Sequence, residues 1–515
     1  MKQYIGADII RQEIPDILHD ESRFESGTPS AVYFPESVDD VKKVLAAAVR
    51  QGKKCTIIGA RTGTTGGAVP EEGTIAVSFS SMKRIRAVES EKDGCTVLVC
   101  EPGITLAEID RFLKAPAEWE YFVPGAGILG AGSLLFYPPD PTEMTAQLGG
   151  TVATNASGAR SYHYGATRRH IAFLELLLAN GETVTLRRQT ANAGKWDRNI
   201  VTDQGTSFTI PSLPYEFGAL KNACGYYNHS RMEAVDLFIG SEGTLAIITG
   251  IGVYLSPAPV LLSGLTFFPS KEAAFDFADF LRNESSIAAI EFFDEGSLRF
   301  IDHYRNRIPD RFPPFPADAH AAVLWEFIEE TPGSFEERME RWEEVLIACG
   351  TSFESTWSGF DETETERLHH FRHALPETVN SIIAENKRSC STIRKIGTDS
   401  AFPAQVFRQS FDTMMELIRS ADLVHAAFGH LGDYHIHVNL VPADAEQLER
   451  ALEVYDEMMA LAVRCAGTVS AEHGVGKIKR KYLGQLYGID GVAAMVAIKK
   501  CLDPDGILNP GNLFL

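Results

Sequence analysis

Apolar residues recur at helical spacing directly after a capping signal near residue 37. Ser37 is a plausible N-cap, and Val41, Leu45 and Ala48 follow it three or four positions apart. Gly52 ends the pattern, and the short apolar run 55–58 follows. The pattern predicts a helix that starts after Ser37, followed by a buried strand over 55–58.

Further apolar runs alternate with polar segments up to residue 257. They predict strands over 74–79 and 96–100, a helix over 105–113, and a buried strand or short helix over 171–178. The stretch 187–232 is polar and rich in turn residues. A stretch of this length is typical of a lid, a binding loop or an insertion.

The pattern changes after Pro257-Ala258-Pro259. Strands are predicted over 262–268, 288–294, 321–328, 424–429 and 434–440, and helices over 271–282, 334–348, 363–384, 404–419 and 443–464. Strands and helices segregated in this way indicate an antiparallel sheet with helices on one face, an α+β unit.

Composition narrows the class of protein. The chain has 515 residues, of which 44% are hydrophobic and 23% charged, so about three structural units are expected. The net charge of −21 argues against a general nucleic-acid binder and against docking on anionic lipid. A small anionic substrate stays compatible, because a few local cations can override the overall field.

The cysteines and the N-terminus indicate a cytoplasmic protein, with peripheral association with a membrane left open. The eight cysteines are scattered without a C-x-x-C pair, which argues against a zinc ribbon or a ferredoxin-type iron–sulfur cluster. The first 20 residues lack the pattern of a signal peptide, and no run of 18 apolar residues predicts a transmembrane segment.

Three glycine-rich segments are candidates for binding a cofactor. Gly125-Ala-Gly127-Ile-Leu-Gly130 matches G-x-G-x-x-G, but prolines on both sides argue against a dinucleotide-binding turn between a strand and a long helix. The segment 59–67 follows the strand at 55–58, and its backbone N–H groups and threonine hydroxyls suit a diphosphate. The segment 147–165 is dense in small residues, which suits either a large flat ligand or a tight helix–sheet contact.

These segments occur in the order G-A-R-T-G-T-T-G-G (59–67), P-P-D-P-T-E (138–143), the glycine-rich run 147–165 and G-S-E-G-T-L-A-I-I-T (240–249). That order resembles the FAD-binding domain of the vanillyl-alcohol-oxidase/PCMH flavoprotein superfamily, and within it the FAD-linked D-2-hydroxy-acid dehydrogenases. The resemblance extends over about residues 30–515. It implies an α+β protein with a PCMH-type FAD-binding domain, an antiparallel-sheet cap domain for the substrate, and a tail that returns to the FAD domain.

The resemblance also implies domain boundaries and a set of flavin-binding residues. The FAD domain is expected over 1–257 with 187–232 as an inserted loop, the cap over 258–465, and a completing segment over 466–515. The residues expected to bind FAD are Gly59, Arg61, Thr62, Gly63, Thr64, Thr65, Gly66, Gly67, Pro138, Asp140, Thr145, Gly149, Gly150, Ala153, Asn155, Gly158, Gly165, Glu242, Gly243, Thr244, Ile248 and Asn509. Non-covalent FAD is expected, because the segment 59–67 holds no His or Cys; His163 is the nearest candidate for a covalent link.

A second cluster of potential ligands lies near the C-terminus. A strand pair that turns at Gly432-Asp433 brings His430 and His437 together, and Glu472 follows in Ser470-Ala-Glu472-His473-Gly474. Two histidines and a carboxylate suit a divalent metal. Hydrogen-bonded structural histidines are the alternative interpretation of the residues alone.

The segments 429–439 and 470–477 resemble the paired substrate-site motifs of the same dehydrogenases. The resemblance implies that His430, His437 and Glu472 bind a divalent metal, commonly zinc, and that His473 is the general base. The family usually has Gly-Asn where Tyr434-His435 stand here, so His435 is a candidate to join or replace a ligand.

The implied reaction is oxidation of a D-lactate-like 2-hydroxy acid to the 2-oxo acid, with hydride transfer to flavin N5. The substrate carboxylate needs cations, and the position in the family pattern suggests Arg372 and Lys395, although either could be a solvated surface charge. The expected electron acceptor is a cytochrome, a quinone or an electron-transfer flavoprotein, and the acidic chain favours a basic redox partner. A homodimer is left open.

Two alternatives remain. An alkyl-glycerone-phosphate-synthase-like transferase shares this fold, but it typically has H-H-H-G where Ala471-Glu472-His473-Gly474 stand. A flavoprotein subunit of a multi-subunit oxidase is the other alternative.

Overall fold

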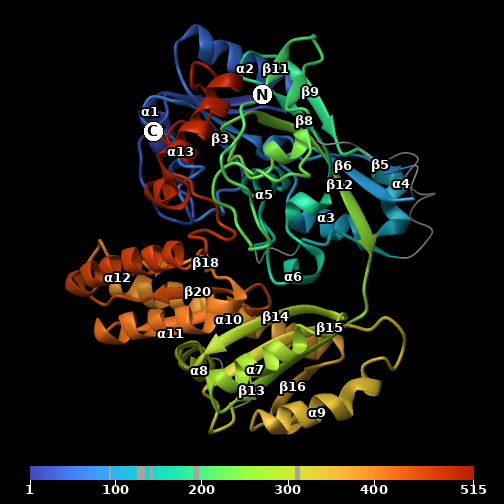
Figure 1. Cartoon of the computed structure of the whole chain (residues 1–515). Helices are drawn as coiled ribbons and strands as arrows, with labels where there is room; N and C mark the ends of the chain where they lie inside the picture. The colour runs from blue at the N-terminus through green and yellow to red at the C-terminus, as the bar shows by residue number, and fades with distance from the viewer. Residues whose placement is uncertain are drawn as a thin grey trace. The chain divides into compact units, whose positions relative to one another are not determined.

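The computed structural model describes residues 1–91, 94–123, 134–139, 143–189, 196–307, 312 and 314–514. The chain forms two compact units (Figure 1). One unit comprises 1–158, 165–258 and 472–515 and is called the FAD-binding unit after the expectation from the sequence; the other comprises 159–164 and 259–471 and is called the cap unit. Residues 159–164 and 466–471 were expected to belong to the FAD domain or to complete it. In the structure they belong to the cap unit.

The first sheet of the FAD-binding unit contains the strand that precedes the segment 59–67. Its order is β1 (Lys2–Ile5), β2 (Ala31–Phe34), β4 (Ile75–Ser78), β3 (Cys55–Ile58), and β2, β4 and β3 are parallel. Helix α2 (Val38–Arg50) begins as predicted, with the Ser37 hydroxyl accepting a hydrogen bond from Asp40 N. Its apolar face packs on β3 and β4 through Val41, Leu45 and Ala48.

The second sheet of this unit is antiparallel. Its order is β5 (Ile85–Ser90), β6 (Thr96–Cys100), β12 (Ile247–Pro257), β8 (Ile171–Leu177), β9 (Thr183–Arg187), and β7 (Leu135–Phe136) pairs with β12. The run 171–178 is therefore a strand. The other helices here are α1 (Ala7–Glu13), α3 (Leu106–Leu113), α4 (Trp119–Phe122), α5 (Leu148–Thr154) and α13 (Leu483–Leu502).

The polar stretch 187–232 carries a small hairpin of β10 (Asn199–Val201) and β11 (Ser207–Thr209). Beyond the hairpin, the Tyr215 ring stacks on Tyr487 of α13 at 4.0 Å between centroids. The Tyr487 hydroxyl donates to Cys224 O and accepts from Asn222 Nδ2. The insertion is thereby attached to α13.

The cap unit is built on an antiparallel sheet, as predicted. Its described strands are, in order, β16 (Thr356–Gly359), β13 (Leu261–Phe268), β15 (Ala321–Ile328), β14 (Ile287–Asp294), β19 (His425–His430), β20 (His435–Leu440) and β17 (Ile396–Gly397), and β18 (Ser400–Ala401) pairs with β20. The helices are α6 (Ser161–Tyr164), α7 (Lys271–Leu281), α8 (Glu295–Arg307), α9 (Met339–Ala348), α10 (Glu362–Asn386), α11 (Ala404–Ser420) and α12 (Ala445–Arg464).

Helices cover both faces of this sheet, so the expectation of one covered face was wrong. Neighbouring residues of a strand point to opposite faces. Phe292 packs on Phe275 of α7 and Phe411 of α11, whereas Phe293 packs on Phe371 of α10. Every residue of β14 is buried, which is the pattern of a strand covered on both sides.

Helix α8 was not predicted from the sequence, although its starting signal is present. The Asp294 carboxylate accepts a hydrogen bond from Ser297 N at 2.7 Å and caps the first turn. The motif at 125–130 lies outside the described residues. Among the described helices, none is both long enough and apolar enough to cross a bilayer.

Candidate active site

The segment 59–67 leaves β3 next to the N-terminal turn of α5. A Cβ built at Gly59 would lie 3.6 Å from Gln147 Oε1 and 3.7 Å from Gly150 Cα. Gln147 Oε1 is buried and has no hydrogen-bond partner among the described residues. A Cβ at Gly63 or Gly150 would meet no described atom within 4 Å. Open space beside these glycines and an unsatisfied buried acceptor fit a large polar cofactor such as FAD.

Gly149 has a different role from Gly150. A Cβ at Gly149 would lie 2.7 Å from Pro102 Cβ and 2.9 Å from Pro102 O. This glycine therefore allows α5 to pack closely on the chain beyond β6.

The C-terminal end of α5 is joined to the turn 240–244. Asn155 ends the helix in the left-handed conformation, with φ 52°, and its Oδ1 accepts from Arg168 N. Glu242 N donates to Ala153 O at 2.8 Å. The two glycine-rich segments that the resemblance assigned to FAD are thus neighbours in this unit.

Glu242 anchors the segment that contains His473. Its carboxylate accepts hydrogen bonds from Val475 N at 2.6 Å and Gly476 N at 2.7 Å. Burial raises the pKa of Glu242 to about 7, although the two backbone donors oppose this shift. Gly243 next to it has to be glycine, because a Cβ there would lie 2.5 Å from Asn509 Nδ2.

Asn509 returns the C-terminal tail to the FAD-binding unit, as predicted. Its Oδ1 accepts from Ile57 N at 2.6 Å, and its Nδ2 donates to Glu242 O at 2.7 Å. One side chain therefore connects β3 with the turn that holds Glu242.

The remaining flavin candidates differ in their surroundings. Arg61 has φ 64°, and Gly165 has φ 85°. The Thr145 hydroxyl is exposed and donates to Glu143, whereas the Thr244 hydroxyl is buried against Tyr226. Asp140 lies outside the described residues. The other flavin candidates lie on the segments 59–67 and 147–165, on the chain near β7, or on β12. They are Thr62, Thr64, Thr65, Gly66, Gly67, Pro138, Ala153, Gly158 and Ile248.

The segment of His473 lies against the segment 59–67 within the same unit. Thr65 Oγ1 donates to His473 O at 3.3 Å, and Lys477 N donates to Thr65 O at 3.0 Å. The Lys477 ammonium donates to Asn512 Oδ1 at 2.8 Å, and burial lowers its pKa to about 8. The half-buried His473 is therefore fixed beside the proposed diphosphate segment.

Glu472 has two partners in the FAD-binding unit that the sequence did not indicate. Its Oε1 accepts from Ser157 Oγ at 2.8 Å and pairs with the ammonium of Lys221. Lys221 comes from the insertion 187–232. Both charged side chains are less than 10% exposed, at 9% for Lys221 and 7% for Glu472.

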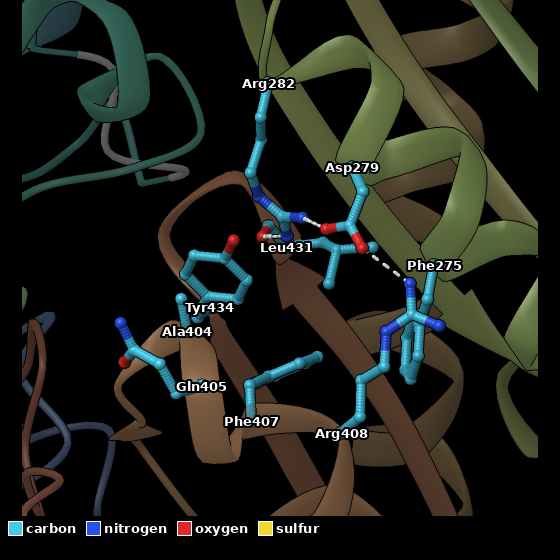
Figure 2. Close-up of a pocket in the computed structure, with 9 residues that line it drawn as sticks. All are labelled: Phe275, Asp279, Arg282, Ala404, Gln405, Phe407, Arg408, Leu431 and Tyr434. Atoms are coloured by element: carbon cyan, nitrogen blue, oxygen red, sulfur yellow. Dashed lines mark hydrogen bonds and ion pairs between the residues drawn. The ribbon is translucent and has the colours of Figure 1, made fainter.

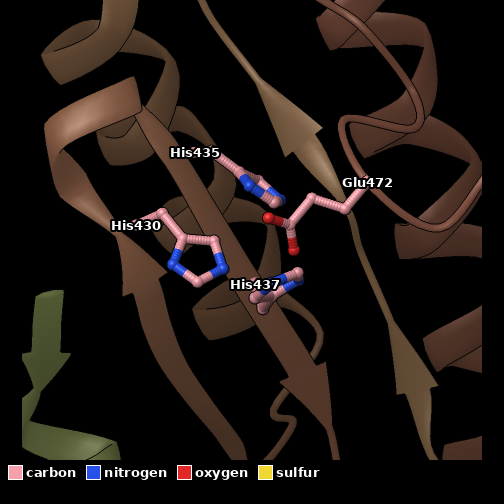
Figure 3. Close-up of side chains that lie close together, drawn as sticks. All are labelled: His430, His435, His437 and Glu472. Atoms are coloured by element: carbon pink, nitrogen blue, oxygen red, sulfur yellow. The ribbon is translucent and has the colours of Figure 1, made fainter. Parts of the chain in front are cut away.

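Three histidines meet on one face of the β19–β20 hairpin in the cap unit (Figure 3). Phe428 pairs with His437, so continuing the antiparallel register sets His430 opposite His435. His435 and His437 are two apart on β20, so they point to the same face. The ring centroids lie 5.3 Å apart for His430 and His435, and 4.4 Å apart for His435 and His437.

Each of the three rings has one nitrogen close to an oxygen of the cap unit. His430 Nδ1 lies 2.6 Å from Glu291 Oε1, His437 Nδ1 lies 3.2 Å from Thr398 O, and His435 Nε2 lies 3.0 Å from Asp399 Oδ1. Metal-binding histidines usually have one ring nitrogen oriented by such an acceptor. The donor set therefore fits a divalent metal of the zinc type.

The predicted ligands come from both units. His430 and His437 are brought together in the cap unit, whereas Glu472 is the first residue after that unit, directly bonded to Ala471. Ala471 N donates to Asp399 O at 2.8 Å, so the end of the cap is fixed at the residue that holds His435.

The two cations proposed for the substrate carboxylate lie in the cap unit with different exposure. Arg372 on α10 is 17% exposed, and its Nε lies 3.4 Å from Glu291 Oε2. Glu291 therefore contacts both Arg372 and His430. Lys395 is exposed just before β17.

A pocket of the cap unit lies at the turn between the histidine strands (Figure 2). Arg282 donates to the carbonyls of Leu431 and Gly432, and its guanidinium lies 3.8 Å from the centre of the Tyr434 ring. Arg282 and Arg408 both pair with Asp279. The carboxylate of Asp279 thus offsets positive charge in the pocket, and the main role of Arg282 is to support the turn.

Two protein-family models match this chain. A family described as "FAD linked oxidases, C-terminal domain" matches residues 260–513, and one described as "FAD binding domain" matches 29–135 and 131–187. Glycolate oxidase subunit GlcD of Bacillus subtilis is 27% identical, covering 94% of this chain and 89% of that protein. D-2-hydroxyglutarate dehydrogenase of Stutzerimonas stutzeri is 26% identical, covering 94% and 91%.

A further relative and a solved structure complete the comparison. A probable mitochondrial D-lactate dehydrogenase of Danio rerio is 27% identical, covering 96% of this chain and 86% of that protein. A structure of alkyldihydroxyacetonephosphate synthase shares the fold, with a TM-score of 0.61 at 15% identity over 98% of this chain and 79% of that one.

The two units and their matches define a flavoprotein of the PCMH type, with an FAD-binding unit and an α+β second unit. Within that class, the chain belongs to the family of FAD-linked oxidases. It is an oxidoreductase, and the predicted fold class is confirmed.

Proposed function

We propose that this protein oxidises a D-2-hydroxy acid of the D-lactate type to the 2-oxo acid. One observation carries the proposal: His473 is bound through its carbonyl to Thr65 of the segment proposed to hold the FAD diphosphate. A candidate base and a candidate flavin site are therefore built into one unit. The names of the relatives support the substrate class, because they include glycolate, D-2-hydroxyglutarate and D-lactate.

The roles divide between cofactors and side chains. When bound non-covalently, FAD would supply an acceptor for the hydride that leaves the substrate Cα, and a divalent metal, with zinc as the expected ion, would supply a Lewis acid for the substrate hydroxyl. His430, His437 and Glu472 are the proposed ligands, and His473 takes the hydroxyl proton, since an imidazole titrates near neutral pH.

Arg372 and Lys395 are proposed to bind the substrate carboxylate. Glu291 offsets part of the charge of Arg372, because the two side chains are paired. Lys395 is exposed, which suits an initial attraction of the anion.

The proposal is tested by mixing the flavin-loaded protein anaerobically with D-lactate, D-2-hydroxyglutarate and glycolate, with zinc supplied. Bleaching of the long-wavelength flavin band by one of these acids is the expected result. His473→Ala should slow the bleaching by at least about 100-fold while FAD stays bound. Unchanged reduction in this variant would remove His473 from the base role.

The same mixture tests the alternatives. A transferase related to alkyldihydroxyacetonephosphate synthase would leave its flavin oxidised with all three acids, and the likeness to that enzyme rests on the fold alone. A subunit that requires partners would bind FAD but show no reduction until a partner is added. The electron acceptor, a cytochrome, quinone or electron-transfer flavoprotein, would be identified by its reoxidation of the bleached protein.

A further inference from the structure

We propose that His435 is a third imidazole ligand, so that the metal is held by three histidines of the cap unit. This inference rests on the metal site of the proposed function. It concerns the position where related sequences usually have asparagine, and it adds a ligand to the expected pair His430 and His437.

The backbone register brings His435 into the ligand group. Continuing the register of the Phe428–His437 pair sets His430 opposite His435 across the hairpin, and His437 is the next residue on the same face of β20. One ring nitrogen of each histidine lies within 4.8 Å of one ring nitrogen of each other histidine. Nitrogens bound tetrahedrally to one zinc lie about 3.4 Å apart, so small side-chain rotations close the site.

The surroundings of His435 are those of an oriented ligand. His435 and Asp399 are both fully buried, and the Asp399 carboxylate lies 3.0 Å from His435 Nε2. Ser470 Oγ donates to the other carboxylate oxygen at 2.6 Å. The Asp399 carboxylate is therefore placed to orient the His435 ring through one nitrogen, whereas the rings of His430 and His437 are held by hydrogen bonds to Glu291 and Thr398.

Three imidazoles favour a zinc-type ion more strongly than two imidazoles do. Imidazole nitrogen suits zinc, cobalt, iron and copper, whereas magnesium, calcium and manganese prefer carboxylate and water oxygens. The site should therefore select zinc or cobalt over magnesium and manganese.

The first test counts ligands in the unsubstituted protein. The metal is removed with a chelator, one equivalent of zinc is restored, and X-ray absorption at the zinc edge is recorded. Three imidazoles per zinc are expected. Two imidazoles per zinc would overturn the proposal and identify His435 and Asp399 as a structural pair.

The second test uses variants and a competing chelator dye to measure zinc affinity. His435→Asn should weaken zinc binding by more than the roughly 10- to 100-fold that loss of an outer-sphere partner costs, and Asp399→Asn should fall within that range. The matched control is His425→Asn, because His425 lies on the same hairpin but pairs with Asp294. Unchanged affinity in folded His435→Asn would contradict the proposal, and His435→Gln replaces it where the asparagine variant does not fold.

The outcomes separate this inference from the proposed function. No zinc binding to the unsubstituted protein would overturn both the third ligand and the metal role. Zinc held by two imidazoles, with flavin still reduced by a D-2-hydroxy acid, would overturn the third ligand alone.

Discussion

Glu242 is a buried acid whose protonation should make stability depend on pH. Folding raises its pKa to about 7 through burial, above the 4.5 of an exposed glutamate. The native state then binds more protons than the unfolded state between these values. Stability therefore falls by about 3 kcal/mol as pH rises from 4.5 to 7, and this contribution is fully present only below 4.5.

Glu242→Gln should flatten this part of the stability profile. Denaturant unfolding of the flavin-loaded protein at pH 5, 6 and 7 measures the slope. The control Glu344→Gln, at an exposed position of α9, should keep the slope of the unsubstituted protein. An equal slope in Glu242→Gln would assign the pH dependence to other groups.

Lys221 should matter more to the metal-free protein than to the zinc-bound one. Its ammonium pairs with the buried carboxylate of Glu472, which is also a proposed zinc ligand. Lys221→Met leaves that carboxylate without its cation, at a cost of roughly 3 kcal/mol, and zinc would compensate for part of the loss.

Unfolding of Lys221→Met with and without zinc measures the difference. The control is Lys271→Met, at a more exposed ion pair with Asp412, and it should cost less than about 1 kcal/mol in both states. An identical loss for Lys221→Met in both states would contradict a shared role of Glu472.

At the scale of single residues, some contacts of the candidate site could be predicted from the sequence and others could not. His430 and His437 were predictable as a pair because a turn at Gly432 lies between them in sequence. Glu291 and Lys221 were not predictable, because Glu291 is 139 residues from His430 and Lys221 is 251 residues from Glu472. Their roles depend on tertiary contacts that no local pattern records.

At the scale of elements, the turn between the histidine strands depends on Arg282. Its guanidinium binds two carbonyls of the turn and stacks on Tyr434, which has φ 54°. Arg282→Met should remove both of these hydrogen bonds, while Leu431 O keeps the one from Tyr434 N, and the change should cost about 1–3 kcal/mol. Because the turn sets the distance between the histidines, zinc affinity should fall as well.

Denaturant unfolding and chelator competition measure both effects. The control Arg419→Met removes an exposed arginine of α11 that pairs with Glu416, and it should change stability by less than about 0.5 kcal/mol. Unchanged stability and affinity in Arg282→Met would show that the hairpin holds the turn without it.

About half of the described helices and strands followed from apolar periodicity, and the errors have physical causes. The run Ile287–Asp294 is buried throughout, so the absence of alternation signals two covered faces rather than one. The described part of the insertion 187–232 has little regular structure and is held by an aromatic contact with α13, which lies far along the chain. Periodicity carries no information about such contacts.

At the scale of the whole molecule, the net charge of −21 contrasts with the anionic ligands proposed for it. Under the proposed function, the binding of these ligands depends on local groups: the backbone of 59–67, Arg372, Lys395 and the metal. The overall charge suits solubility and a basic redox partner. The family could be predicted from motif order over more than 400 residues, whereas the substrate side chain could not, because no motif specifies it.

Enantiomer-specific reduction of the flavin tests the central claim most directly. The zinc-loaded flavoprotein is mixed anaerobically with D-lactate or with L-lactate, and the flavin band and the 2-oxo acid product are followed together. The account predicts bleaching by the D-enantiomer, with one 2-oxo acid formed per flavin, and no bleaching by the L-enantiomer. If the flavin stays oxidised with D-lactate, D-2-hydroxyglutarate and glycolate alike, the result would contradict the proposed function.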